Sequence, residues 1–187
     1  GFAGLEHYIF ETDSSTYIEK FIVSLKPDDM PFTDFVIIGG DGAFSQLINS
    51  IAKHPEKEKL LKLSIGIMPG GSTNALAWGL GGKDPYFAAI NILREKTVKG
   101  DAFKLIMNDQ KEWSEMYATT FTYGFPSDIM IESQNLRSIF GQYRYVIIGA
   151  KKFFCSFKLP LYSSKIEFKV DDFEIEENKS LKQEKII

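Results

Sequence analysis

The chain has 187 residues, 44% of them hydrophobic, and a formal net charge of −3 at pH 7. These values are typical of a packed globular protein with one large or two small domains. It has no basic run, so the sequence predicts neither nucleic-acid binding nor a polybasic membrane anchor. Cys155 is the single cysteine, which excludes an internal disulfide and fits a reducing, cytoplasmic compartment. No apolar run reaches about 18 residues, so we expect no transmembrane segment.

Residues 1–96 alternate between strand-like and helix-like patterns. Runs rich in β-branched and aromatic residues predict strands at 8–12, 34–40 and 63–71. Helical apolar periodicity predicts helices at 14–25, 42–52 and 84–96. This order is typical of a parallel sheet with right-handed crossovers, and we expect an α/β domain that is incomplete at its N-terminus.

Residues 97–187 have a different pattern, in which apolar and polar residues alternate. This alternation predicts antiparallel strands at 101–108, 112–125 and 164–176. Turn signals occur at Asn108-Asp109 and at Ser163-Ser164, and one helix is expected at about Gly141 to Ser156. We therefore expect a second, mostly antiparallel β domain with one inserted helix, also incomplete.

The most informative segment is the junction between the second strand and the second helix. Val36, Ile37 and Ile38 predict a short strand buried on both faces, and Gly39-Gly40-Asp41-Gly42 follows it. Glycines at the end of a strand let backbone amides approach a ligand, because no Cβ intervenes. The helix that follows, from about Ala43, points its unpaired N–H groups at the same place, which favours phosphate binding.

A second loop of this kind lies one βαβ unit later, at Pro69 to Asn74. Gly70 and Gly71 would again open the backbone, while Ser72 and Thr73 carry hydroxyl donors for phosphate oxygens. Asn74 would fix the shape of the loop or reach a nucleotide. Two such loops at neighbouring strand ends predict a crevice suited to a polyphosphate.

Asp41 is unexpected beside phosphate, because an acid repels an anion unless it handles a proton or a metal ion. The alternative for Asp41, Ser72 and Thr73 is ordinary helix capping, which would explain either loop alone. Two such loops in consecutive strand-to-helix turns favour the phosphate site. Neither loop has the Walker pattern or the dinucleotide-binding G-x-G-x-x-G pattern.

Three segments in order resemble the lipid kinases that share the diacylglycerol kinase catalytic domain, among them sphingosine kinases, ceramide kinases and bacterial diacylglycerol kinases. GGDG at 39–42 resembles their nucleotide loop, and PGGSTNALA at 69–77 resembles their P-x-G-[ST]-x-N segment in its sphingosine-kinase-like form. Residues 123–145 resemble the G-F-x-x-D-x-x-x-E-S segment of sphingosine and ceramide kinases. The resemblance covers about residues 8–168.

This resemblance implies an N-terminal nucleotide-binding domain like those of phosphofructokinase and NAD kinase. Asp41 would be the catalytic acid residue that accepts the proton of the lipid hydroxyl. The residues implied in ATP binding are Gly39, Gly40, Gly42, Gly70, Gly71, Ser72, Thr73, Asn74, Arg137 and Arg144. The alternative for the two arginines is a solvated helix face. Mg²⁺ is expected because phosphoryl transfer depends on charge neutralisation, although the residues do not indicate its ligands.

The resemblance also places Asp128, with Phe125 and Met130, beside the acceptor head group. The alternative for Asp128 is a turn residue after Pro126-Ser127. Met130 stands where sphingosine kinases have a second acid that pairs with an ammonium, so ceramide or another uncharged head group is as plausible as sphingosine. Glu132 would compensate if its direction on a strand allowed it. Gln46 replaces a further family acid, which leaves metal or nucleotide positioning open.

Apolar residues gather in and beside the late helix, and they would form either core or part of an acyl-chain pocket. They are Phe140, Tyr143, Tyr145, Val146, Ile147, Ile148, Phe153 and Phe154. The family's N-P-x-x-G-like loop before Tyr8 and its late acidic segment do not occur, so we expect a fragment.

These features together predict an ATP-dependent lipid kinase of the sphingoid or ceramide type, which acts on lipid at a membrane surface as a peripheral protein. Two alternatives stay open: a diacylglycerol kinase, and a nucleotide-binding scaffold without catalysis. The missing N-terminal loop and the replacements at Gln46 and Met130 favour the scaffold.

Overall fold

A computed structural model of the protein describes residues 4–95, 97–109, 112–155 and 162. The elements in chain order are α1 Tyr17–Ser24, η1 Pro27–Asp29, β1 Asp34–Gly39, α2 Asp41–Lys53, α3 Lys57–Leu60, β2 Ser64–Pro69, α4 Ala75–Gly79, α5 Pro85–Leu93, β3 Phe103–Asp109, β4 Glu112–Ala118, α6 Phe125–Glu132, η2 Ser133–Leu136, α7 Arg137–Phe140, η3 Gly141–Tyr143 and α8 Arg144–Cys155. The elements labelled η are short 3₁₀ helices.

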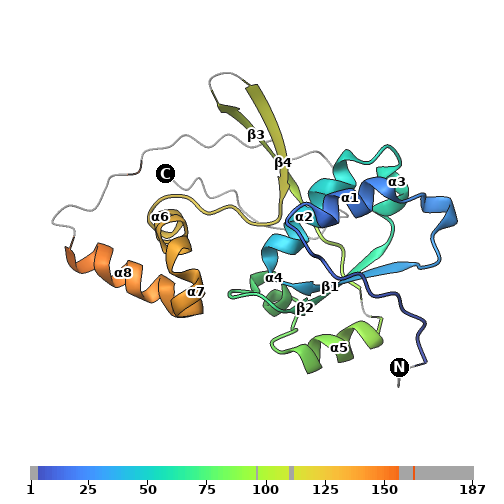
Figure 1. Ribbon diagram of the computed structural model, residues 1–187, viewed down its shortest axis with the longest axis horizontal. Coiled ribbons are helices and arrows are strands. Elements are labelled where there is room, and N and C mark those ends of the chain that lie inside the picture. The colour runs from blue at the N-terminus through green and yellow to red at the C-terminus, as the bar shows by residue number, and fades with distance from the viewer. Residues whose placement is uncertain (1–3, 96, 110–111, 156–161, 163–187) are drawn as a thin grey trace, which may run out of the picture.

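The N-terminal part is an α/β layer structure, as predicted. β1 and β2 pair in parallel, in a register that runs from Asp34 opposite Ser64 to Gly39 opposite Pro69. Helices α1 to α3 lie on one side of this sheet and α5 on the other (Figure 1). Helices α1, α2 and α5 lie within the predicted ranges 14–25, 42–52 and 84–96, except that α2 begins one residue earlier and ends one residue later. No strand forms at 8–12, where the described backbone is irregular.

The core fills the space between this sheet and the first three helices. Ile22, Leu47, Ile51 and Leu60 are buried to 4% exposure or less and form its centre. They project from α1, α2 and α3, and the half-buried residues packed around them are Ile18, Phe21, Leu25, Met30, Phe35, Ile37, Leu63 and Ile65. The amphipathic helices therefore cover one face of β1 and β2.

The opposite face of β1 is more open than predicted. Val36 is 49% exposed and Ile38 is 76% exposed, so the prediction of a strand buried on both faces is wrong for the described chain. The reason is that α5 packs against β2, where Ile92 reaches Gly66, and does not extend over the end of β1. The apolar run at 36–38 predicted the strand correctly but not its environment.

The second sheet is a hairpin formed by β3 and β4, which pair antiparallel with Phe103 opposite Ala118. Asn49 of α2 attaches this hairpin to the first unit. Its Nδ2 donates to the Tyr117 carbonyl at 2.8 Å, and its Oδ1 accepts from the Tyr117 amide at 2.8 Å. One side-chain amide thus pairs with the backbone of β4 as a neighbouring strand would.

The chain after β4 is more helical than predicted. The strand expected to reach residue 125 ends at Ala118, and α6 begins at Phe125. Gly124 at φ 79° turns the chain and Pro126 stands in the first turn of α6, where a missing N–H costs nothing. Glu132 therefore lies on a helix, and its predicted strand direction is wrong. The strand at 164–176 and the Ser163-Ser164 turn lie outside the described residues.

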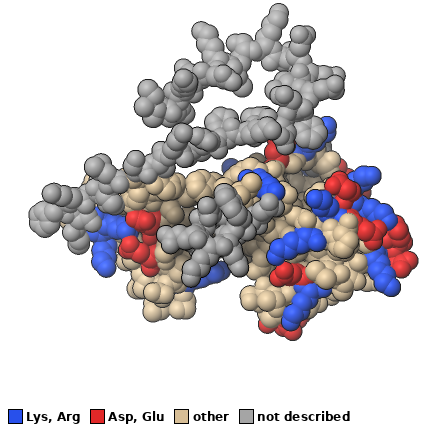
Figure 2. All heavy atoms as spheres, turned by 90° about the horizontal axis from the view of Figure 1, so that it is seen from above, with Lys and Arg blue, Asp and Glu red and all other residues tan. Residues whose placement is uncertain are grey.

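The helices α6, α7 and α8 form a group at one end of the molecule, and the charged residues of α1 to α3 lie at the other (Figures 1 and 2). Basic and acidic side chains mix over that charged end, where Lys53 pairs with Glu19 and Lys59 pairs with Asp28. Among the described helices none is both long and apolar enough to cross a membrane.

Replacing Asn49 by alanine should lower the free energy of unfolding by about 1–3 kcal/mol, because the Tyr117 amide and carbonyl lose their partners. Urea-induced unfolding measures this change. Gln46→Ala, an exposed position on the same helix, is the control and should stay within about 0.5 kcal/mol of the wild type. Equal stability of the two variants would show that Asn49 does not hold the hairpin.

Candidate active site

The two glycine loops lie side by side at the carboxyl ends of β1 and β2. The Gly70 amide donates to the Gly39 carbonyl at 2.9 Å, which extends the strand pairing into both loops. A Cβ on Gly71 would lie 2.5 Å from the Gly40 Cα, and a Cβ on Gly40 would lie 3.0 Å from the Gly71 Cα. Both positions therefore require glycine for contact within the protein. A Cβ on Gly42 would have no neighbouring atom within 4 Å, so the contact between the loops does not explain why residue 42 is glycine.

Asn74 fixes the shape of the second loop. It lies in the left-handed region at φ 54°, where asparagine is tolerated better than most residues. Its Oδ1 accepts from the Gly71 amide at 2.7 Å, and its Nδ2 donates to the Gly71 carbonyl at 2.8 Å. Of the two roles predicted for Asn74, the geometry supports the shaping of the loop.

Asp41 is the first residue of α2, and its carboxylate reaches the second loop. Oδ2 accepts from the Ala75 amide and Oδ1 from the Leu76 amide, each at 3.0 Å. The prediction that Asp41 caps a helix is therefore correct in part. The helix that it caps is α4, and not α2, which Asp41 itself begins. Ser72 and Thr73 make no capping bond to α4, whose first flanking residue is Asn74. This bridge holds the Asp41 carboxylate in a fixed position between the loops.

Beside Asp41 lies a cavity of about 70 Å³, enclosed by α2, α4 and the end of β4. It is lined by Asp41, Phe44, Ser45, Ile48, Ala75, Leu76, Tyr117, Ala118, Thr119 and Thr120. Apolar side chains and hydroxyl groups thus surround one carboxylate. The volume holds a group the size of a hydroxymethyl, and the hairpin attached through Asn49 supplies one wall.

The first residues of α8 approach the second loop from the other side. Arg144 is 3% exposed, and its Nε and Nη1 have no hydrogen-bond partner among the described residues. The hydroxyl oxygen of Tyr145, the next residue, lies 3.4 Å from the hydroxyl oxygen of Thr73. Arg137 is exposed on α7, and its charge acts on Tyr145. The two predicted arginines and the Thr73 loop therefore converge, and a buried guanidinium with free donors fits a bound anion.

Asp128 belongs to a separate cluster between α6 and α8. Its Oδ2 accepts from the Tyr162 hydroxyl at 2.5 Å and lies 3.5 Å from Lys152 Nζ, which also lies 2.5 Å from Glu132 Oε1. Asp128 and Glu132 stand one helical turn apart on α6, so both face Lys152. Asp128 is therefore more than a turn residue, and its charge already has a partner.

The same contacts shift the ionisation of this cluster. The hydrogen bond from Tyr162 lowers the pKa of Asp128, and the charge of Lys152 adds to this against the opposing effect of burial. The hydrogen bond with Glu132 raises the pKa of Lys152, and the bond to Asp128 raises the pKa of Tyr162. The Asp128 carboxylate and the Lys152 ammonium therefore stay charged at neutral pH.

The remaining predicted acceptor residues lie near this cluster on α6. Phe125 is half-buried and Met130 is 44% exposed. Among the apolar residues of the late helix, Ile148 is buried, whereas most of the others are exposed. The exposed members are Phe140, Tyr143, Val146, Ile147, Phe153 and Phe154. This stripe therefore does not form core within the described chain.

The described residues contain no group of three or more His, Cys, Asp or Glu side chains that could hold a metal ion. Gln46, at the position where an acid was expected, is exposed on α2. Mg²⁺ commonly takes one or two carboxylates together with substrate phosphates, so a nucleotide-dependent site does not need a protein cage.

Sequence reasoning missed the residues that connect these segments. Asn49, Lys152 and Tyr162 each act on a partner that is distant in the chain, as in the 68-residue separation between Asn49 and Tyr117. No local pattern marks such residues. Tyr145 was assigned only to an apolar stripe, although its hydroxyl lies against polar groups.

Gly71→Ala should separate the two loops, because its Cβ would lie 2.5 Å from the Gly40 backbone. We expect a loss of about 1–3 kcal/mol in the free energy of unfolding, measured by urea denaturation. Gly79→Ala on α4 is the matched control, since its Cβ would meet nothing within 4 Å. If the two variants were equally stable, the loops would not be in contact as described.

Asp128→Asn should lower the thermal unfolding midpoint at neutral pH. A carboxyl whose folded pKa is lowered stabilises the fold above its unfolded pKa and loses this effect as the pH falls through the folded pKa. The difference between variant and wild type should therefore disappear at strongly acidic pH. The exposed Asp29→Asn is the control, and the same difference at every pH would contradict the role assigned to the Asp128 charge.

Comparisons with known proteins identify the family of the chain. The model of the family described as "Diacylglycerol kinase catalytic domain" matches residues 3–105, which contain both glycine loops and the first three residues of β3. The matched range therefore includes Gly40, Asp41 and Gly71.

Curated relatives extend the similarity further along the chain. "Sphingoid long-chain bases kinase 1" of Arabidopsis thaliana is 32% identical over 172 residues, which is 89% of this chain and 21% of the relative. "Sphingosine kinase 2" of Homo sapiens is 25% identical over 153 residues, which is 78% of this chain and 23% of the relative. The chain thus spans about a fifth to a quarter of the length of these relatives. The family match over residues 3–105 and the similarity to these relatives show that the chain belongs to the diacylglycerol kinase catalytic domain family, near the sphingosine kinases.

Proposed function

We propose that the chain forms part of an ATP-dependent lipid kinase that phosphorylates the primary hydroxyl of a sphingoid lipid, sphingosine or ceramide, at a membrane surface. Residues 1–96 bind the nucleotide, and residues 97–187 contribute to the acceptor site. The observation that carries the proposal is the Asp41 carboxylate, held between two touching glycine loops and open to a cavity on one side. The names of the curated relatives support the class of lipid.

The glycine loops and the arginines suit a polyphosphate. The first hydrogen bond of the 13-residue helix α2 runs from the Ala43 amide to the Gly40 carbonyl at 3.0 Å, so the preceding Asp41 and Gly42 amides are available to an anion at the loop. Ser72 and Thr73 add hydroxyl donors from the neighbouring loop, and Arg144 adds two unpaired nitrogens. Arg137 lies on the same side and adds positive charge. Mg²⁺ would complete the charge neutralisation, with phosphate oxygens among its ligands.

Bound ATP supplies the group that moves, so that a bond forms from the acceptor oxygen to the γ-phosphorus while the bond to the bridging oxygen of ADP breaks. Asp41 receives the proton that the acceptor hydroxyl loses. Its oxygens each accept one amide hydrogen bond, and each carboxylate oxygen has a further lone pair for this task. The small cavity beside Asp41 positions the hydroxyl end of the acceptor, while Phe44 and Ile48 exclude water.

The cluster on α6 and α8 bears on the choice of acceptor. Lys152 already pairs with Asp128 and Glu132, and Met130 brings no charge, so both carboxylates are engaged and the three charged groups leave a single net negative charge for a lipid ammonium. This pairing favours ceramide over sphingosine, and it makes diacylglycerol a second candidate. The exposed apolar side chains of α8 are then available to acyl chains.

Transfer from γ-labelled ATP to sphingosine, ceramide and diacylglycerol, each in the same mixed micelles, tests the proposal. We expect ceramide to be phosphorylated fastest. A protein that binds ATP and phosphorylates none of the three would be the nucleotide-binding scaffold instead. Preference for sphingosine would overturn the argument from Lys152 while leaving the kinase assignment intact.

Asp41→Asn should reduce turnover by about 100- to 10,000-fold, because the amide cannot take up the hydroxyl proton. ATP affinity should be retained, since Asn can still accept a hydrogen bond from α4. Asp34→Asn, at the opposite end of β1, is the control and should leave turnover unchanged. Labelled-phosphate transfer and equilibrium ATP binding give the two readouts. Undiminished turnover in Asp41→Asn would remove Asp41 from the chemistry.

A further inference from the structure

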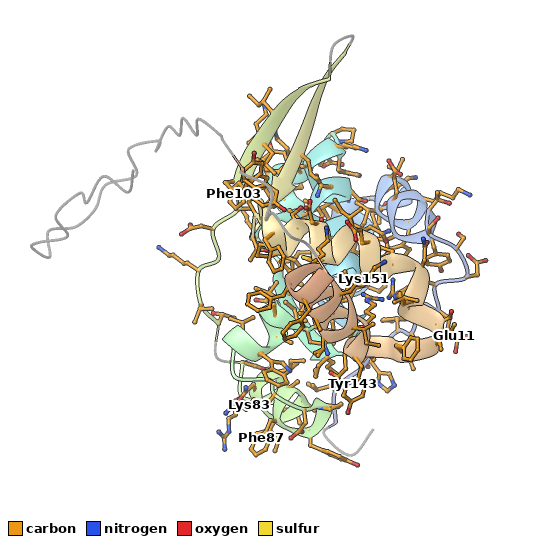
Figure 3. All side chains as sticks on the ribbon, turned by 90° about the vertical axis from the view of Figure 1, so that its left-hand side faces the viewer. Glu11, Lys83, Phe87, Phe103, Tyr143 and Lys151 are labelled. Carbon is orange, nitrogen blue, oxygen red and sulfur yellow. The ribbon has the colours of Figure 1, made fainter. Side chains whose placement is uncertain are left out.

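Tyr145 lies where helix α8 meets the second glycine loop. It is the second residue of α8 and is half-buried, in contrast to Tyr143, which is 68% exposed. Figure 3 labels Tyr143 on the segment that leads into this helix. The Tyr145 hydroxyl is within 3.5 Å of two polar groups that are distant from each other in the chain, Arg144 and Thr73. A tyrosine that served only as core would not need both contacts.

The contact with Arg144 is the stronger of the two. Arg144 Nη2 donates to the Tyr145 hydroxyl at 2.5 Å, and the guanidinium carbon lies 4.6 Å from the centre of the same ring. The ring face and the hydroxyl therefore both restrain one guanidinium, through a cation–π contact and a hydrogen bond. Nε and Nη1 have no partner in the part of the chain that the structure describes, on a residue only 3% exposed, so a fixed guanidinium presents two donors there.

The contact with Thr73 is longer. The two hydroxyl oxygens lie 3.4 Å apart, beyond the usual range for hydroxyl hydrogen bonds, so most of the restraint comes from Arg144. The Tyr145 oxygen accepts from Arg144, and either hydroxyl can be the donor in the contact with Thr73. Burial acts to raise the pKa of Tyr145, but the bonds with Thr73 and Arg144 and the charges of Arg144 and Arg137 outweigh it, so the pKa is lowered. Positive charge therefore converges on this hydroxyl.

We propose that Tyr145 is a positioning residue, which holds the Arg144 guanidinium against the Thr73 loop so that both reach the same terminal phosphates of a nucleoside triphosphate. This inference rests on the proposed nucleotide site. It adds a role for the tyrosine hydroxyl, which acts through Arg144 and does not itself need to touch the nucleotide. The apolar ring alone would not supply this role, because it cannot accept the Nη2 hydrogen bond.

Tyr145→Phe in the intact protein tests the inference, because it keeps the ring and removes only the hydroxyl. We expect ATP affinity to fall by about 3- to 10-fold, since one hydrogen bond to a charged group is lost. Affinity for adenosine, which has no phosphates, should stay unchanged. Equilibrium titration with each ligand measures both values. A general loss of structure would lower the two affinities together.

Tyr143→Phe is the matched control, because it removes a hydroxyl from an exposed tyrosine two residues earlier. It should leave ATP affinity unchanged. In a background of Arg144→Gln, Tyr145→Phe should cause no further loss, since the residue through which it acts is gone. If Tyr145→Phe does not fold, Thr73→Val at an exposed position should weaken ATP binding in its place, without changing adenosine binding.

The outcomes separate this inference from the function on which it rests. Wild-type protein that binds ATP, together with equal ATP affinity in Tyr145→Phe, overturns the positioning role and leaves the kinase assignment standing. Additive losses in Tyr145→Phe and Arg144→Gln also overturn it, because the tyrosine would then act independently. Wild-type protein that binds no ATP overturns both.

Discussion

The hydrogen bond from the Gly70 amide to the Gly39 carbonyl is the interaction on which the remaining geometry depends. It continues the parallel pairing past the ends of β1 and β2, and so brings two loops to a separation that only glycine permits. Because Gly40 and Gly71 touch, the residue after Gly40 reaches the amides that follow Asn74. The position of Asp41 is thus a consequence of the strand register. The residues on the core-facing side of each strand set this register.

Charge is distributed unequally between the two sides of the candidate site. On the proposed nucleotide side, Arg144 carries a buried positive charge whose Nε and Nη1 have no partner among the described residues, a costly arrangement in a protein interior unless an anion occupies the site. On the proposed acceptor side, Asp128 and Glu132 share one Lys152, so both carboxylates are engaged and one net negative charge is left. The first arrangement is prepared for a strongly charged ligand, and the second is suited to a ligand of little charge.

Local patterns predicted the glycine loops, because a strand, a glycine cluster and a helix are contiguous in the sequence. They did not predict α6, where Phe125 to Glu132 is too short for a clear helical period, and the alternation upstream favoured a continued strand. They also overestimated the burial of Val36 and Ile38, since an apolar run does not show whether a helix covers it. Contacts across long separations, 68 residues for Asn49 and Tyr117 and 72 for Thr73 and Tyr145, have no local signal at all.

Helix α2 carries Asp41 at its first turn and Asn49 eight residues later, a distance of about 12 Å along the axis. Asn49 forms hydrogen bonds with both backbone groups of Tyr117. Helix α2 therefore connects the hairpin directly to the Asp41 carboxylate. Any tilt of β3 and β4 would therefore also move α2 and the Asp41 carboxylate, so that under the proposed function a lipid bound against the hairpin would change the position of the proposed proton acceptor.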